Sequence, residues 1–444
     1  MYSVKSVYLK SMKTVGFVLL CLSMMNAHAQ SPKDLAELWE KEHISTIFPS
    51  DVRHSDLKNY VAKLKKLGIR INEVGRSGAD REIYQAEFGR GPLKVFMWSQ
   101  MHGDEPTATS SVIDMLATLQ SNRDKDWVRN IEEKMTIRVV PMLNPDGAEA
   151  YKRRNLQDID INRDAIDLKT PEARLLKQLR DTWSPVIGFN LHNQQALTTV
   201  GNSPKQAAIS LLVVFGDKAK TTSEGHERNK RIAAAMVEAL QKFIPGNIGK
   251  YDDEFTATAF GDNFSAWGTP VILIETGALF GKDEMFLVKM NFIALLTAIQ
   301  SLATGSERTQ SPQPYLSLPE NGSGNLVNYV FRNVRSSVGT EIRPLGDVSA
   351  VTTRRRASFS VSNTIRAIGP LGSVKGHEEY DTSGFVMVQR FRSLKAGNLA
   401  DFLFYRNGRN VDWVAPGIEK AYPPDAVFSG GKWTVGSGIV PKIR

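Results

Sequence analysis

A histidine and a glutamate three positions apart follow a strongly apolar run in the first quarter of the chain. Residues 93–98 form that run, and it leads into His102 and Glu105. Pro106 then opens residues 107–119, which predict a helix, because proline is tolerated in a first helical turn. Zinc can take an imidazole and a carboxylate from one segment in this way. A zinc site would still need a third ligand and an open position for water.

Two later apolar runs end in groups of the same kind. Residues 186–191 lead into His192, and residues 271–274 lead into Glu275. In an open α/β sheet, groups at the carboxyl ends of the strands meet outside one edge of the sheet. Taken alone, a histidine at a strand end is more often a structural residue than a metal ligand. Glu275 is harder to explain in that way, because an unpaired buried carboxylate is costly.

Cationic and amide side chains lie between these runs. Residues 144–147 read Asn-Pro-Asp-Gly, which predicts a turn. Arg153 and Arg154 follow, and then Asn162 and Arg163. Arginines in such a place can hold a carboxylate through two hydrogen bonds and polarise a carbonyl. The alternative for each of them alone is a solvated loop.

The order of these motifs resembles that of the zinc carboxypeptidases of the carboxypeptidase A type. The likeness extends over about residues 50–305. It rests on His-Gly-Asp-Glu-Pro at 102–106, Asn-Pro-Asp-Gly at 144–147, Asp-Ile-Asn-Arg at 160–163, His192, and Ile-Glu-Thr-Gly at 274–277. The resemblance implies an α/β fold with a mixed, mostly parallel sheet flanked by helices.

The resemblance also implies the roles of the metal ligands and of the base. His102, Glu105 and His192 would bind one zinc ion and leave a position for water. Glu275 would be the general base that takes a proton from that water and later passes it to the leaving amine.

The same resemblance implies how a substrate is held. Arg153 would polarise the scissile carbonyl, and its neighbour Arg154 is the alternative for a contact with substrate. Asn162 and Arg163 would bind the terminal carboxylate, which accounts for cleavage at a chain end. Asp262 would line the side-chain pocket and favour a cationic or diaminopimelate-type group, although a capping role explains it equally well.

The chain departs from the family at one position. Digestive members carry a tyrosine over the substrate, upstream of the catalytic glutamate. Here Tyr251 lies near that position but not at the expected offset from Glu275. Tyr251 is therefore a candidate substitute.

The N-terminus predicts export. Lysines precede an apolar stretch at 15–25, and Ala27-His28-Ala29 offers a cleavage site before Gln30. This stretch is too short for a permanent membrane anchor. The single cysteine, Cys21, lies inside it, so the mature chain would have no disulfide. We expect a periplasmic or secreted bacterial protein after cleavage near residue 29.

Composition and residue patterns limit the class of protein and predict further elements of the chain. The 444 residues, 41% of them hydrophobic, can supply more than one core. The net charge of +9 is mostly scattered and is not interleaved with aromatic residues, which argues against nucleic-acid binding. Periodicity predicts helices at 33–41, 55–67, 223–243 and 286–303, and strands at 69–74, 81–88 and 135–142.

The last part of the chain changes character. Residues 306–314 are linker-like in composition, and residues 315–444 alternate in short runs that favour a β-rich accessory domain. This region weakly resembles the small β-sandwich that accompanies amidohydrolase barrels, without the metal-binding histidines. The predicted organisation is a signal peptide at 1–29, a catalytic domain at 30–305, a linker, and the accessory domain.

These features predict an exported zinc metallocarboxypeptidase that hydrolyses a C-terminal peptide bond. One alternative is a zinc amidase with the same fold that acts on cell-wall peptides or N-acyl amino acids. Another is a catalytically inactive protein that binds peptide or glycan. The expected partner is a peptide or peptide-like substrate.

Overall fold

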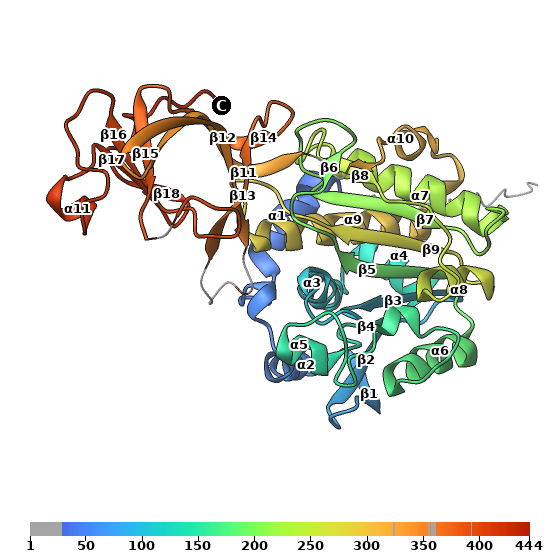
Figure 1. Cartoon of the computed structure of the whole chain (residues 1–444). Helices are drawn as coiled ribbons and strands as arrows, with labels where there is room; N and C mark the ends of the chain where they lie inside the picture. The colour runs from blue at the N-terminus through green and yellow to red at the C-terminus, as the bar shows by residue number, and fades with distance from the viewer. Residues whose placement is uncertain (1–28, 323–324, 354–355, 357–360, 392) are drawn as a thin grey trace, which may run out of the picture.

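The chain forms an α/β domain followed by a strand-rich C-terminal region (Figure 1). The computed structural model describes residues 29–322, 325–353, 356, 361–391 and 393–444. The predicted signal peptide, up to residue 28, lies outside the described residues.

A mixed sheet is the centre of the α/β domain. Its strand order is β1-β2-β4-β3-β5-β9-β7-β8. The four middle strands β4, β3, β5 and β9 are parallel. At one side β2 is antiparallel to β4 and to β1, and at the other side β7 is antiparallel to β9 and parallel to β8. The strands are β1 (Arg70–Arg76), β2 (Glu82–Gly89), β3 (Leu93–Ser99), β4 (Met135–Val140), β5 (Ile187–Asn193), β7 (Ile209–Val214), β8 (Ile248–Lys250) and β9 (Val271–Thr276). The predicted fold class is confirmed.

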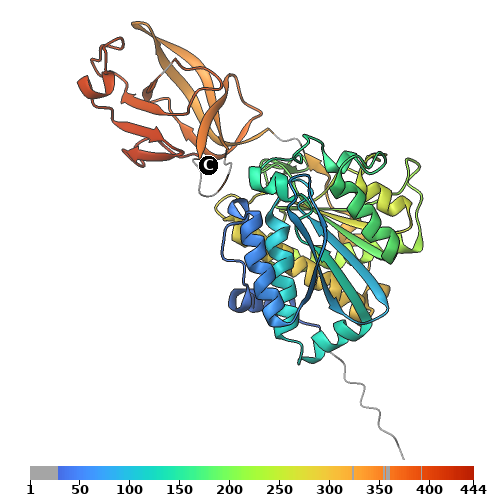
Figure 2. The ribbon, with the colours of Figure 1, turned by 90° about the horizontal axis from the view of Figure 1, so that it is seen from below.

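Helices cover both faces of this sheet (Figures 1 and 2). Along β3 the side chains alternate, so that Val95 and Met97 join one apolar core while Phe96 and Trp98 join the other. The first core packs against α1 (Pro32–Glu42), α2 (His54–Leu67), α3 (Thr107–Ser121), α4 (Asp126–Lys134), α7 (Glu224–Leu240) and α9 (Glu284–Thr304). The second packs against α6 (Pro171–Trp183) and α8 (Phe260–Ala266).

Helix α9 is long and apolar enough to span a membrane by length and composition alone. In the structure, 78% of its apolar window is buried inside the protein. It packs against α7, α3, α1 and α4. We therefore describe α9 as a core helix of this domain.

Residues 144–147 begin a helix rather than a plain turn. Helix α5 (Pro145–Ala150) starts there, and the Asn144 side chain accepts a hydrogen bond from the Gly147 N–H at 2.8 Å. Asparagine followed by proline suits both a turn and the start of a helix, so local chemistry did not separate the two. The prediction of a simple turn was wrong.

The segment predicted as a linker lies against the α/β domain. It contains a short 3₁₀ helix (Ser306–Arg308) and leads into α10 (Gln313–Leu316), which packs on α7. Tyr315 is buried, and its hydroxyl accepts a hydrogen bond from the Val213 N–H at 2.9 Å. Strand β10 (Asn321–Gly322) then pairs with β6 (Thr199–Val200).

The C-terminal region is built from strands, as predicted. Long strands β11 (Leu326–Val338) and β12 (Glu341–Thr353) pair with each other, and the sheet order is β13-β12-β11-β15-β16-β17-β18 with β14 also on β11. The remaining strands are β13 (Ser362–Gly369), β14 (Lys375–Asp381), β15 (Phe385–Gln389), β16 (Phe402–Arg406), β17 (Ala426–Ser429) and β18 (Lys432–Val435). A separate aromatic core, with Phe331 and Phe428 at its centre, holds them together.

Candidate metal centre

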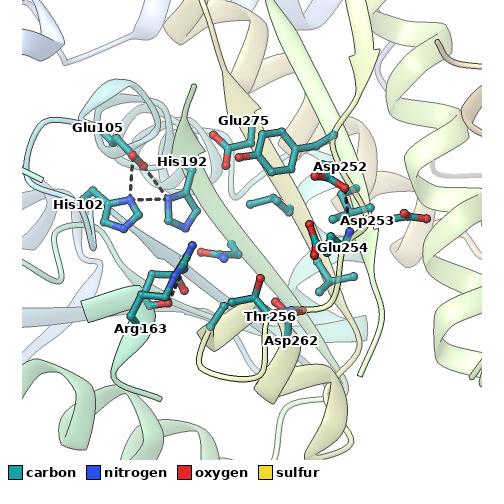
Figure 3. A pocket seen from close by; sticks show the side chains of 18 of the residues that line it. His102, Glu105, Arg163, His192, Asp252, Asp253, Glu254, Thr256, Asp262 and Glu275 are labelled. Atoms are coloured by element: carbon teal, nitrogen blue, oxygen red, sulfur yellow. Dashed lines mark hydrogen bonds and ion pairs between the residues drawn. The ribbon is translucent and has the colours of Figure 1, made fainter. Parts of the chain in front are cut away.

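Three buried side chains converge beyond the ends of β3 and β5 (Figure 3). His102 lies in the turn after β3, Glu105 lies two residues before α3, and His192 is near the end of β5. Nδ1 of His102 is 2.8 Å from one oxygen of Glu105, and Nδ1 of His192 is 2.6 Å from the other. The two Nδ1 atoms are 3.1 Å apart. The sequence analysis placed these residues together, and the structure does so too.

This donor set fits a zinc ion. The ligand atoms of His102, Glu105 and His192 all lie within 4.8 Å of one another. Two imidazole nitrogens and one carboxylate, with a side left open to a pocket, are the protein ligands of catalytic zinc sites. The two Nδ1 atoms face each other, and lone pairs on both would repel at this distance unless a cation or a proton lay between them.

The three groups perturb one another strongly. Burial alone would raise the pKa of Glu105, but the two imidazoles outweigh it and hold that pKa below its usual range. Burial lowers the pKa of His192. His102 is also buried, yet Glu105 and Asp160 raise its pKa overall. The imidazoles differ because only His102 has a second carboxylate.

Asp160 and Arg153 surround the first histidine. Asp160 is 3.0 Å from Nε2 of His102, which leaves Nδ1 facing Glu105 and His192. Arg153 donates to Asp160 at 3.0 Å and to Glu105 at 3.1 Å. A carboxylate behind a metal-ligating histidine fixes the orientation of its ring. Sequence reasoning gave Asp160 no role, although its place in the Asp-Ile-Asn-Arg motif was a signal.

Glu275 lies beside the three candidate ligands. It is directly opposite His192 in the β5–β9 register, and only 7% of it is exposed. Burial, and then the charge of Glu105, raise the pKa of Glu275 well above its ordinary value. Among the described residues no hydrogen bond or ion pair to its carboxylate is found. A buried carboxylate without a partner is costly, so this one is expected to serve the site.

Tyr251 lines the same pocket as Glu275. Burial and the nearby Glu275 carboxylate raise the pKa of the Tyr251 hydroxyl to about 12. The phenol is therefore a neutral donor at ordinary pH. Tyr251, the candidate substitute for the tyrosine of digestive members, therefore lies in the same pocket as Glu275.

The pocket has a volume of about 140 Å³ and extends from the candidate ligands to Asn162, Arg163 and Asp262. The Asn162 side-chain oxygen accepts from the Phe260 N–H at 2.9 Å, so its NH₂ group is the part left for a ligand. Asp262 accepts from the Thr256 N–H at 2.9 Å, and burial raises its pKa to about 6.

Arg154 does not line this pocket. Its guanidinium donates to the Asp158 carbonyl at 2.7 Å, and the side chain is exposed. Because adjacent residues in a loop can point in different directions, the sequence did not distinguish Arg154 from Arg153. The structure brings only Arg153 to the candidate ligands.

A second hollow, of about 590 Å³, continues from the other side of Glu105 and Arg153. Gln194, Gln195 and Asn321 help to line it. The two hollows adjoin at the candidate ligands, because Glu105, Arg153 and Tyr251 line both of them.

Part of this chain is similar in sequence to known proteins. Residues 59–267 match the zinc carboxypeptidase family. That stretch contains all the predicted site residues except Glu275, which lies eight positions beyond it.

Two curated proteins share sequence with this region. The chain is 34% identical over 201 residues to "Probable carboxypeptidase 2" of Arthroderma benhamiae. It is 35% identical over 197 residues to the protein of the same name from Trichophyton verrucosum. Each match covers 44% of this chain and 36% of the relative, so the chain spans little more than a third of either relative's length.

Among solved structures, a metallo-carboxypeptidase from Burkholderia cenocepacia is similar with a TM-score of 0.46 and 16% sequence identity. That similarity covers 56% of this chain and 68% of the other.

Proposed function

We propose that this chain is an exported zinc metallocarboxypeptidase. The proposal is supported by the match of residues 59–267 to the zinc carboxypeptidase family. It hydrolyses the last peptide bond of a chain with a free C-terminal carboxylate. The observation that carries the proposal is the cluster of His102, Glu105 and His192, with Glu275 beside it and no described residue bonded to the Glu275 carboxylate.

The three clustered residues hold the metal. A zinc ion bound there would supply a Lewis acid for the scissile carbonyl and an acidified water. Glu275 takes the proton of the attacking water and delivers it to the nitrogen of the departing residue. Burial and the charge of Glu105 raise its pKa, and this makes it a stronger base than an exposed carboxylate.

The remaining pocket residues hold the substrate. Arg153 is close to Glu105 and stabilises the carbonyl oxygen as negative charge develops on it. Asn162 and Arg163 bind the terminal carboxylate from the far end of the pocket, through an amide and a guanidinium. Tyr251 donates its hydroxyl proton toward the substrate. Asp262, at the same end, favours a cationic side chain on the residue that is released.

We assign the parts of the chain accordingly. Residues 1–29 are the export signal, and the protein acts in the periplasm or outside the cell. Residues 30–305 form the catalytic domain, to which residues 306–322 are bound by Tyr315 and β10. The strand-rich region after them is an accessory domain.

Assay of the purified protein on matched substrates tests the proposal. Peptides with a free C-terminus should be hydrolysed, whereas the same peptides with a C-terminal amide should not. Muropeptides and N-acyl amino acids belong in the same assay, because turnover of those alone would favour a cell-wall amidase or a deacylase. Tight binding of peptide without turnover would favour a binding protein.

A further inference from the structure

The segment that carries Arg153 is placed by the end of helix α5. Tyr151, just after α5, has a left-handed backbone with φ of 50°, which a non-glycine residue rarely adopts. Two residues later, the Arg153 carbonyl accepts from the Gly103 N–H at 3.4 Å and from the Asn144 side chain at 3.4 Å. Gly103 is next to His102, so the end of α5 sets where Arg153 lies relative to the metal centre.

The start of α5 is fixed from within the catalytic domain. The Asp146 carboxylate accepts from Ser77 at 2.8 Å, from the Ala79 N–H at 2.9 Å and from Arg81 at 2.6 Å. The backbone of Gly147 lies close to Gly103. A Cβ added to Gly103 would be 1.9 Å from the carbonyl carbon of Gly147. Both ends of α5 need support, because a helix of six residues is too short to be stable alone.

The other end of α5 is held from the C-terminal region. Arg356, only 6% exposed, donates to the Glu149 carbonyl at 2.7 Å and to the Ala148 carbonyl at 3.1 Å. Its guanidinium carbon lies 5.2 Å from the centre of the Tyr151 ring. The last carbonyls of a helix lack partners within the helix, and a cation stabilises that end. A single side chain thus supports both the end of α5 and the unusual backbone after it.

A second contact shows that the C-terminal region lies against this part of the catalytic domain. The ring of Phe280, in the loop after β9, stacks on His377 of β14 with centroids 4.5 Å apart. A hollow of about 410 Å³ is lined jointly by Tyr151 and by Tyr329 and Thr352 of the C-terminal region. Arg356 therefore belongs to an interface with several contacts.

We propose that Arg356 is a positioning residue through which the accessory domain holds the segment 148–153, so that Arg153 faces the metal centre. The proposal rests on the proposed function in one respect, namely that Arg153 stabilises the reacting carbonyl. It gives the accessory domain a role in catalysis without any contact to substrate.

Two measurements on the full-length zinc-loaded protein test this role. The variants are Arg356→Gln and Arg356→Lys. Arg409→Gln is the matched control, because Arg409 also donates to a backbone carbonyl, that of Pro423 at 2.9 Å, and lies over Tyr405 at 5.5 Å, within its own domain. The first measurement is kcat and KM on a peptide with a free C-terminus. The second is hydrogen exchange of the amides in residues 147–153, which does not depend on activity.

We expect Arg356→Gln to lower kcat by about 10- to 100-fold, with KM and zinc content nearly unchanged, because a misplacement of about 1 Å can cost on the order of 100-fold. Exchange in residues 147–153 should become faster. The kcat and the exchange rate of Arg356→Lys should lie between those of the wild type and those of Arg356→Gln, because lysine keeps the charge but lacks the planar guanidinium with its paired donors. Arg409→Gln should match the wild type in both measurements.

The proposal would be overturned if Arg356→Gln had the same kcat as the wild type and the same amide exchange in residues 147–153. If that variant also melts at a lower temperature, Arg356→Lys decides: a lowered kcat at an unchanged melting temperature supports the role, and an unchanged kcat refutes it. A wild-type protein that hydrolyses no peptide contradicts the proposed function instead. In that case the exchange data alone decide whether Arg356 holds residues 147–153.

Discussion

Glu275 is buried and Asp262 is half-buried, and these two carboxyl groups of one pocket differ in their surroundings. Asp262 is held by the Thr256 N–H, and its pKa is raised to about 6 mainly by burial. Burial also raises the pKa of Glu275 well above its ordinary value, and the charge of Glu105 beside it adds to that rise. A carboxyl group that binds a proton readily suits acid–base work, whereas one that is ionised above pH 6 suits recognition of a cation.

Replacement of Glu275 by glutamine should abolish turnover while the metal stays bound. We expect kcat/KM to fall by about 10²- to 10⁴-fold, the range for loss of a general base. Zinc content by elemental analysis should stay at that of the wild type, because Glu275 is not among the clustered ligands. Glu254→Gln is the control, since Glu254 lines the same pocket but is exposed. Near-wild-type hydrolysis by Glu275→Gln would refute the assigned role.

Asp262 should make hydrolysis of peptides ending in lysine depend on pH near 6. Its carboxyl is neutral below its pKa of about 6 and ionised above it. Binding of a C-terminal lysine should therefore improve as pH rises through 6, which lowers KM. Peptides ending in leucine should lack this step. Asp262→Asn should remove the step for lysine and leave leucine unaffected, and an unchanged lysine profile in that variant would show that Asp262 serves only to hold the Thr256 N–H.

At the scale of elements, the parallel strands explain why the sequence indicated so much of the site. His102, His192 and Glu275 each follow an apolar run, and the ends of parallel strands meet at one edge of a sheet. No such rule governs loops. Arg153 and Arg154 are adjacent in sequence, and only packing around α5 decides which one reaches the metal centre. Asp160 was not assigned a role for the same reason, because its contact with His102 is set by a loop.

The start of α5 shows a second limit of local patterns. Asn-Pro-Asp-Gly has the residues of a turn, and here they begin a helix of six residues. Contacts from distant parts of the chain, to Asp146 and to Gly147, stabilise that choice. A short window of sequence does not contain them.

Gly103→Ala should destabilise the junction between the metal-binding turn and α5. A Cβ on Gly103 would be 1.9 Å from the Gly147 carbonyl carbon and 2.3 Å from the Ala148 nitrogen. Both are backbone atoms, so the two segments must separate, at a cost of about 1–3 kcal/mol or more. Chemical denaturation measures the loss. Gly372→Ala is the control because no atom lies within 4 Å of its added Cβ, and equal stability of both variants would contradict this packing.

At the scale of the whole molecule, composition and structure divide the chain at different places. The hydrophilic composition of residues 306–314 predicted a free linker. From sequence alone, a domain boundary is recognised by such a break in the hydrophobic periodicity. The residues after this segment are bound to the α/β domain by contacts with residues far away in sequence. Tyr315 reaches Val213 on β7, and Asn321 donates to Gln194 at 2.6 Å and accepts from Ser210 at 2.7 Å. These partners are more than 100 positions away in sequence.

Truncation should therefore show that residues 306–322 stabilise the catalytic domain assigned to residues 30–305. A chain ending at residue 305 loses Tyr315, and with it a buried ring of the kind whose removal costs about 3–5 kcal/mol. It also leaves the Val213 N–H without its partner, and it loses the Asn321 bonds beside the metal centre. A chain ending at residue 322 keeps all of these. We expect the shorter chain to melt at a clearly lower temperature than the longer one, and to bind zinc less tightly. Equal melting temperatures would place the boundary at 305, where composition alone puts it.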